Sequence, residues 1–232
     1  RCSRDWSSDV CSSDLAIAEG EELVNDIEQR TESWFAIRCG KVTASRVNDL
    51  MAKTKTGYAA SRDNYMAQLV CERITGKPAE SYSNASMQWG TEQEPFARAA
   101  YEAHTGVIVE ETGFHRHPTI EAAGASPDGL VGEDGLVEIK CPNTATHIDT
   151  LLDEFIPIKY FCQMQMQMVC TGRKWCDFVS FDPRMPEGAQ LFVQRLHRDE
   201  NFVKKMEEEI SKFLVELDRK TSKINEFIEA SK

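Results

Sequence analysis

Apolar residues recur at helical spacing along several stretches of the chain. The longest stretch follows Asp199 and contains Phe202, Met206, Ile210, Phe213, Leu217, Ile224 and Ile228. This spacing places them on one face of a long amphipathic C-terminal helix, which we expect to pack on the body of the protein or on a neighbouring subunit. The same reasoning predicts helices at residues 61–74, 88–105 and 159–170. We expect Ser61 to cap the first of these and Gly76 to follow its end.

Shorter runs rich in β-branched and aromatic residues lie between these helices. They predict strands at residues 107–109, 124–131, 136–141, 175–181 and 190–196. Gly132-Glu133-Asp134-Gly135 is a strong turn signal, so the second and third of these strands form a hairpin. Helices and strands in this order predict an α/β fold with a mixed central β-sheet flanked by helices. Since the chain has no clear linker and no repeat, we expect a single domain over residues 16–232.

The first fifteen residues, RCSRDWSSDVCSSDL, look unlike the rest of the chain. They contain Ser-Ser-Asp twice, and residues 5–15 resemble the in-frame translation of a sequencing-library adapter. We therefore expect residues 1–15 to be non-native and the native N-terminus to be missing; a natural terminal extension is the alternative. We expect such a segment to lie outside the folded domain.

The charge balance limits the kinds of protein this chain can be. Its 27 lysines and arginines against 38 acidic residues give a net charge of −11, which excludes a histone-like DNA binder. Residues 30–77 nevertheless carry nine basic and four acidic side chains, which indicates a local anion-binding surface. No apolar run reaches the roughly 18–20 residues that span a bilayer. The eight cysteines lack regular spacing, so we expect reduced thiols and a cytoplasmic protein.

The predicted hairpin carries the strongest candidate chemistry. Asp128 lies on its first strand, and Glu138 and Lys140 lie on its second. Because side chains alternate along a strand, Glu138 and Lys140 point one way while Val137 and Ile139 point into the core. Asp128 can reach the same place from across the turn. An aspartate followed by Glu-x-Lys is weak evidence by itself, because surface ion pairs produce the same pattern. The apolar residues that alternate with these charges favour a functional site.

Two carboxylates a few ångströms apart repel each other unless a cation lies between them. Ligation by oxygen alone indicates a small hard cation, Mg²⁺ or Mn²⁺. The ammonium of Lys140 beside that ion would suit a water or hydroxide held in line with a phosphorus atom.

The stretch from Ser126 to Lys140 resembles the PD-(D/E)xK signature of restriction-endonuclease-like nucleases. The motifs around it resemble the phage lambda exonuclease family of viral recombinases. Four further matches agree in order and spacing: WFAIR at 34–38 with VTAS at 42–45, WGTEQE at 89–94, YFCQMQ at 160–165 and FDPRM at 181–185. The resemblance covers nearly the whole chain after the first fifteen residues. It implies a restriction-endonuclease-like core.

The resemblance also implies roles for single residues. Asp128, Glu138 and the backbone carbonyl of Ile139 would bind Mg²⁺, for which Mn²⁺ would substitute, and Glu94 would help to hold a second ion. For Glu94 the alternative is an ordinary solvated glutamate on a helix.

The tyrosine and glutamine motif implies a further pair of roles. Gln163, one helical turn beyond the DNA-binding position Tyr160, would orient the phosphate or the attacking water; the alternative is a buried amide bonded to backbone. Met87 matches an apolar residue that wedges terminal base pairs apart, although we favour simple core packing for it. Met164, Met166 and Met168 alternate along the chain, and we favour core packing for them too.

Arg38, Ser45 and Ser126 resemble the family's pocket for a 5′-terminal phosphate, and Lys55 matches another basic position. Guanidinium and hydroxyl donors bind a phosphate dianion better than a singly charged internal diester, so a 5′-phosphorylated end would be preferred. The alternative for Arg38 is a surface salt bridge, and for Lys55 an ordinary solvated side chain.

These features predict an exodeoxyribonuclease that digests one strand of linear duplex DNA from a 5′-phosphorylated end and leaves 3′ overhangs for phage-type recombination. By resemblance it would be a homotrimeric ring threaded by DNA, with a single-strand annealing protein as partner. A related endonuclease and a catalytically idle DNA-end-binding protein are the alternatives. His115 and His117 form a rival metal pair, but no third ligand at usable spacing supports zinc. An iron–sulfur site is rejected because the Cys-x-x-Cys element is absent.

Overall fold

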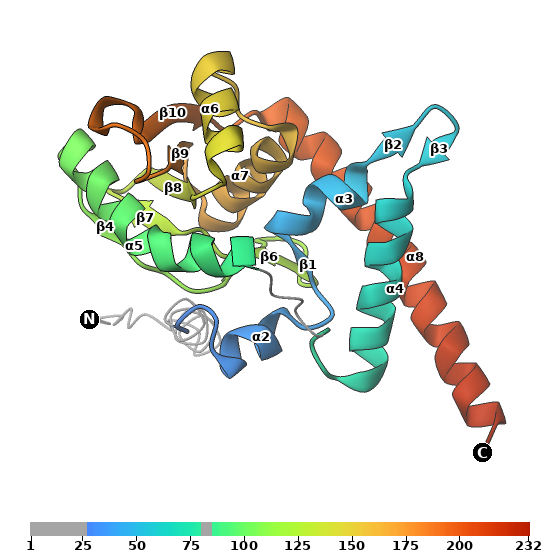
Figure 1. The fold of residues 1–232 in the computed structure, drawn as a ribbon. Helices are drawn as coiled ribbons and strands as arrows, with labels where there is room; N and C mark the ends of the chain where they lie inside the picture. Colours follow the sequence, from blue (N-terminus) through green and yellow to red (C-terminus); the bar gives the residue numbers. More distant parts are fainter. Residues whose placement is uncertain (1–26, 80–84) are drawn as a thin grey trace, which may run out of the picture.

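The computed structural model describes residues 27–79 and 85–232, so the adapter-like segment at 1–15 lies outside the described residues. At the centre is a five-stranded sheet with the order β10-β9-β8-β7-β4 (Figure 1). β8 and β9 run parallel, whereas the other neighbouring pairs run antiparallel, so the expected mixed sheet is confirmed. Its strands are β4 (Val109–Glu110), β7 (Gly129–Val131), β8 (Gly135–Lys140), β9 (Trp175–Phe181) and β10 (Leu191–His197).

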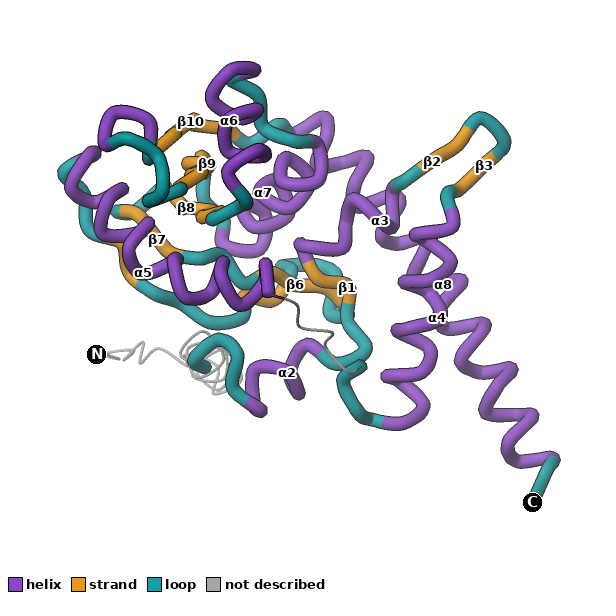
Figure 2. The backbone as a smooth tube through the Cα atoms, in the orientation of Figure 1, coloured by secondary structure: helices purple, strands orange, loops and turns teal. Residues whose placement is uncertain are grey.

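Two helices cover opposite faces of this sheet (Figure 2). α5 (Ala85–Thr105) packs on the face that carries Val137 and Ile139 of β8. α7 (Ile158–Thr171) packs on the other face, against Leu136. Because side chains alternate along a strand, Glu138 shares the α7 face and is buried there instead of facing solvent.

A further group of helices packs on the side of α7 away from the sheet. It comprises α3 (Val47–Met51), α4 (Ala60–Thr75) and α8 (Glu200–Ala230). Their core includes Leu50, Tyr65, Met66, Leu69, Val203, Met206, Ile210, Phe213 and Leu217. The expected long amphipathic C-terminal helix is therefore confirmed, and its last turns extend beyond the body of the protein (Figure 1).

Two smaller sheets complete the strands of the described residues. One has the order β1-β6-β5 and the other is the β2–β3 hairpin. Their strands are β1 (Val42–Thr43), β2 (Lys53–Thr54), β3 (Gly57–Tyr58), β5 (His115–Arg116) and β6 (Ala123–Ala125). The remaining elements are α2 (Glu32–Arg38), α6 (Thr144–Asp153) and the 3-10 turns Ala44–Arg46 and Glu187–Ala189.

The predicted helices are confirmed, with small differences at their ends. α4 stops before Gly76, whose φ of 64° lies in the left-handed region that favours glycine. The expected role of Ser61 is wrong, because α4 begins one residue earlier and Ala59 occupies its cap position. Asp199 does cap α8, accepting hydrogen bonds from two backbone N–H groups.

The strand expected at residues 124–131 is divided between two sheets. Its first part belongs to β6 of the small sheet and its last part to β7 of the main sheet. Pro127 lies between them, and proline has no N–H to donate to a ladder. The division places Ser126 between the two sheets and Asp128 immediately before β7. The strand expected at 107–109 is also displaced, because β4 begins only at Val109.

The side chains of Met164, Met166 and Met168 are fully buried, which confirms that they belong to the core. All six cysteines within the described ranges are free thiols, as expected. In those same ranges, no helix has both the length and the apolar character that a membrane crossing requires.

Candidate active site

Glu138 is the buried centre of the candidate site. Its side chain is 0% exposed and accepts hydrogen bonds from Gln163 Nε2 and Gln167 Nε2, both at 2.6 Å. Lys140 forms an ion pair with it from the same strand. Gln163 and Gln167 are one turn apart on α7, so one face of this helix presents both amides to β8. The carboxylate is thereby held in one orientation by three donors, which is how a buried charge is tolerated.

Asp128 lies across the hairpin from Glu138. Gly129 pairs with Val137, so the preceding residue, Asp128, stands opposite Glu138. The backbone N–H of Ile139 donates a hydrogen bond of 2.7 Å to Asp128 Oδ2. Burial raises the pKa of Asp128 to about 8, and the charge of Glu138 adds to the effect. The structure thus brings Asp128, Glu138 and Lys140 together as the sequence predicts.

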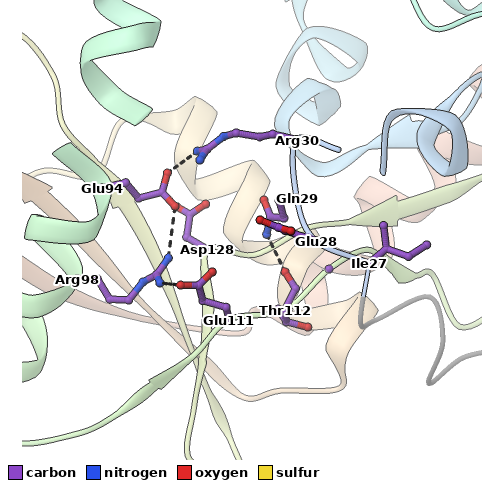
Figure 3. Close-up of a pocket in the computed structure, with 10 residues that line it drawn as sticks. Ile27, Glu28, Gln29, Arg30, Glu94, Arg98, Glu111, Thr112 and Asp128 are labelled. Atoms are coloured by element: carbon purple, nitrogen blue, oxygen red, sulfur yellow. Dashed lines mark hydrogen bonds and ion pairs between the residues drawn. The ribbon is translucent and has the colours of Figure 1, made fainter. Parts of the chain in front are cut away.

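Glu94 enters the site from α5 and is held by two arginines (Figure 3). Arg30 Nη2 lies 2.5 Å from Glu94 Oε2, and Arg98 Nη2 lies 3.5 Å from Glu94 Oε1. Glu94 and Asp128 line one cavity of about 310 Å³. Neither arginine stands out among the motifs of the sequence. Arg98 could have been found from its position four residues after Glu94 on one helix, whereas no local signal points to Arg30.

The acidic side chains suit a divalent cation in their chemistry. Carboxylate oxygens are the ligands that Mg²⁺ and Mn²⁺ prefer, and the raised pKa of Asp128 reflects burial and negative charge that a cation would relieve. Within the described residues, however, no three His, Cys, Asp or Glu side chains already form a metal-holding group. Glu94 and Glu138 are instead neutralised by Arg30, Arg98 and Lys140. Asp128 and Glu138 are the pair that best fits such an ion.

A second cavity of about 180 Å³ brings together four of the sequence-predicted residues: Arg38, Ser45, Ser126 and Gln163. Arg38 Nη1 donates to Ser126 Oγ at 3.1 Å, and Trp34 Nε1 donates to the same oxygen at 3.0 Å. The guanidinium of Arg38 stacks over the ring of Trp34 at 3.8 Å. Burial lowers the pKa of Arg38 to about 10, so the group remains a cation. This cavity, called the arginine–serine pocket below, has the donors that an anion requires.

The remaining predicted residues, Tyr160, Lys55 and Met87, do not line the arginine–serine pocket. Tyr160 stacks on Phe178, and Lys140 Nζ lies 5.3 Å from the centroid of the Tyr160 ring. Lys55 is exposed in the turn between β2 and β3 and lines neither cavity. The interpretation of Met87 as a core residue is wrong: it is 52% exposed in the first turn of α5, and it lines a cavity of about 390 Å³ together with Arg38 and Ser45.

The rival pair of histidines is engaged in separate contacts. His115 Nε2 lies 2.7 Å from Thr112 Oγ1, whereas His117 Nε2 lies 3.2 Å from Glu207. His117 Nδ1 also accepts hydrogen bonds from two backbone N–H groups of the following turn. Both imidazoles therefore have structural partners of their own.

We expect His115 to make the protein less stable in mild acid. Burial lowers its pKa from 6.5 to about 4, so the folded protein keeps the imidazole neutral while the unfolded chain takes up a proton. The stabilising contribution is complete above pH 6.5 and is lost as the pH falls towards 4. The free energy of unfolding, measured with urea across this pH range, should depend less steeply on pH in His115→Gln than in the parent chain. His104→Gln, at an exposed position, should behave like the parent chain; equal slopes in all three would contradict this assignment.

Comparison with known proteins identifies the family. The model of the YqaJ-like viral recombinase domain matches residues 33–174. The chain is also similar to an alkaline exonuclease, LHK-Exo, from Laribacter hongkongensis, with a TM-score of 0.81 and 52% identity. The structure of LHK-Exo in complex with dAMP matches with a TM-score of 0.82 and 53% sequence identity. Each match covers 87% of this chain and 100% of that chain.

A more distant likeness supports the fold alone. A phage related exonuclease from Haemophilus somnus 129PT is 17% identical with a TM-score of 0.67, and the match covers 79% of this chain and 96% of that one. No curated protein sequence matches the chain. The family model spans more than half of the chain, and the motifs that resemble viral recombinases lie on the same fold as LHK-Exo. The chain therefore belongs to the YqaJ-like viral recombinase family.

Proposed function

We propose that this protein is a Mg²⁺-dependent exonuclease that digests one strand of linear duplex DNA in the 5′-to-3′ direction. It starts at a 5′-phosphorylated end and leaves 3′ overhangs for phage-type recombination. The observation that carries the proposal is the position of Gln163. The Gln163 amide donates a hydrogen bond to Glu138, and the Gln163 side chain also lines the arginine–serine pocket. One side chain thus connects the place for bond cleavage with the place for a terminal phosphate.

Asp128 and Glu138 would hold the ion, with Glu94 and the carbonyl of Ile139 as further candidates. A divalent ion there supplies Lewis-acid stabilisation of the negative charge that develops on phosphate oxygens. Burial opposes the charge of Lys140, but the carboxylates of Glu138 and Asp128 outweigh it and raise its pKa. Lys140 is therefore an ammonium in its ion pair with Glu138. It can donate a hydrogen bond that orients the attacking water or the phosphate.

The arginine–serine pocket supports the choice of the DNA end. Arg38 can present two parallel N–H groups to a phosphate, and Ser45 and Ser126 add hydroxyl donors. A terminal phosphate carries up to two charges and three free oxygens, so it matches this donor set better than an internal diester does. Binding the end in this pocket would set the distance from the terminus to the bond that is cut.

We expect Arg38→Ala to reduce the preference for 5′-phosphorylated ends. Loss of a charge-assisted contact to a terminal phosphate should lower kcat/KM on phosphorylated ends by about 10- to 100-fold, with little change on 5′-hydroxyl ends. The measurement is the ratio of initial rates on two duplexes that differ only in this phosphate. Arg198→Ala, which removes a pair with exposed Glu200, is the matched control. An unchanged ratio in Arg38→Ala would contradict the assignment of the pocket.

A nuclease assay on linear and closed circular DNA, in Mg²⁺ or EDTA, tests the proposed function. We expect digestion of linear duplex from 5′-phosphorylated ends, none in EDTA, and no cutting of closed circles. Equal cutting of circles would favour a related endonuclease. Binding of ends without cleavage in Mg²⁺ or Mn²⁺ would favour an idle end-binding protein. The intact Asp128, Glu138 and Lys140 argue against that second possibility.

We also propose an oligomeric state, a partner protein and a cellular location. A homotrimeric ring with basic residues lining its channel would reconcile the net charge of −11 with a DNA substrate. A single-strand annealing protein would receive the 3′ overhang, in the cytoplasm of a bacterial host. These points rest on the family resemblance, and sedimentation of the full chain tests the trimer directly.

A further inference from the structure

Residues 27–30 line the cavity that also contains Glu94 and Asp128, called the acidic cavity below (Figure 3). Gln29 Nε2 donates hydrogen bonds to the backbone carbonyls of Thr112, at 2.9 Å, and Pro127, at 2.8 Å. Because Pro127 directly precedes Asp128, this side chain ties the segment to the loop that carries the first acidic residue. Arg30, the next residue, has a φ of 68°, which is uncommon outside glycine. The two hydrogen bonds of Gln29 hold the backbone of the neighbouring Arg30 beside the cavity.

The side chain of Arg30 is less restricted than its backbone. It is 50% exposed, and its described partner is Glu94, which is 16% exposed. Arg98, on the other side of Glu94, is only 17% exposed and also pairs with Glu111. Of the two arginines that neutralise Glu94, Arg30 is thus the one that can leave with a small loss of contacts.

Arg30 also lies beside a second cavity. It lines both the acidic cavity with Glu94 and Asp128 and the arginine–serine pocket. Gln29, which anchors the segment, is the other residue that lines both. Arg98 lines the acidic cavity but not the arginine–serine pocket. Arg30 therefore lies between the carboxylates and the arginine–serine pocket, whereas Arg98 does not.

We propose that Arg30 exchanges Glu94 for a DNA phosphate when a divalent cation binds Glu94. The inference rests on the proposed function and adds a DNA-binding residue to it. A guanidinium binds carboxylates and phosphates through the same fork of N–H donors, so both partners suit it. A divalent cation at Glu94 competes for the same carboxylate oxygens and repels the guanidinium. The DNA backbone beside the arginine–serine pocket then offers Arg30 a negative partner within reach of its anchored backbone.

The first half of the exchange is tested without DNA and without activity. Mn²⁺ titration calorimetry on the full chain should give an affinity about fivefold higher for Arg30→Gln than for the parent, since a competing cation has been removed. Arg30→Lys keeps the charge and should stay close to the parent. Arg198→Gln removes an arginine outside both cavities and should leave the affinity unchanged. Equal affinities for Arg30→Gln and the parent would overturn the exchange.

The second half is tested by binding of a 5′-phosphorylated duplex. With Ca²⁺ in place of Mg²⁺, Arg30→Gln should bind about tenfold more weakly than the parent, and in EDTA the two should differ by less than twofold. A similar loss in both conditions would mean that Arg30 is merely part of a constant DNA surface, and it would overturn the exchange. A parent chain that binds no Mn²⁺ would instead contradict the proposed function itself. The two failures are therefore distinguishable.

Discussion

Glu138→Gln should reduce exonuclease activity by at least about 10³-fold, or about 4 kcal/mol in activation free energy. Glu138 accepts from Gln163, Gln167 and Lys140, so its two oxygens face donors alone. A glutamine has a single acceptor oxygen, and its NH₂ group would face another donor. The substitution also removes the buried negative charge that best fits a divalent cation. The variant is nearly isosteric, so the loss arises from charge and hydrogen bonding and not from a cavity.

The comparison that makes this prediction decisive is Glu92→Gln. Glu92 is an exposed residue of α5 close to Glu94 in sequence, and its substitution removes the same charge outside the buried centre. Its activity should stay within about twofold of the parent. Circular dichroism and thermal unfolding of both variants verify that the fold is intact. Lys140→Ala, which leaves both amide bonds to Glu138 in place, should also lose at least about 10²-fold. More than a tenth of the parent rate in Glu138→Gln would contradict the assigned role.

The proximity of Asp128 to Glu138 could be predicted because it depends on local rules. Val131 pairs with Gly135 across a three-residue turn, and this register brings Asp128 opposite Glu138. Side-chain alternation then separates Glu138 from Val137 and Ile139. The burial of Glu138 could not be predicted in this way. It depends on α7 covering the second face of the sheet, which is a contact between segments far apart in the chain.

The contacts of the acidic residues illustrate the same limit. Gln167 and Gln163 share a helical face, which the sequence reveals, but their common bond to Glu138 arises from how α7 crosses β8. Arg30 reaches Glu94 from 64 positions away. Hydrophobic periodicity contains no information about such pairs. Arg38 and Ser126, 88 positions apart, were connected by family resemblance and not by spacing.

The divided strand at residues 124–131 has a physical explanation within the sequence. Pro127 interrupts any ladder that would run through it, and the strand prediction gave the flanking apolar residues more weight than this signal. The consequence is functional, because the break allows Ser126 to point into the arginine–serine pocket while Asp128 begins the main sheet. A continuous strand would have fixed the two residues on one ladder.

The strand before this break should tolerate substitution poorly, and Gly124→Ala should destabilise the protein by about 2–3 kcal/mol, lowering Tm by about 5–10 °C. A Cβ at Gly124 would overlap the ring of Phe114, which is fully buried, and would lie 2.7 Å from the backbone oxygen of His115. A backbone atom in a paired strand cannot move aside without breaking β5–β6 pairing. Gly188→Ala, where a Cβ meets no atom within 4 Å, should change stability by less than about 0.5 kcal/mol. Similar Tm values for the two variants would mean that the packing around β6 is looser than this geometry requires.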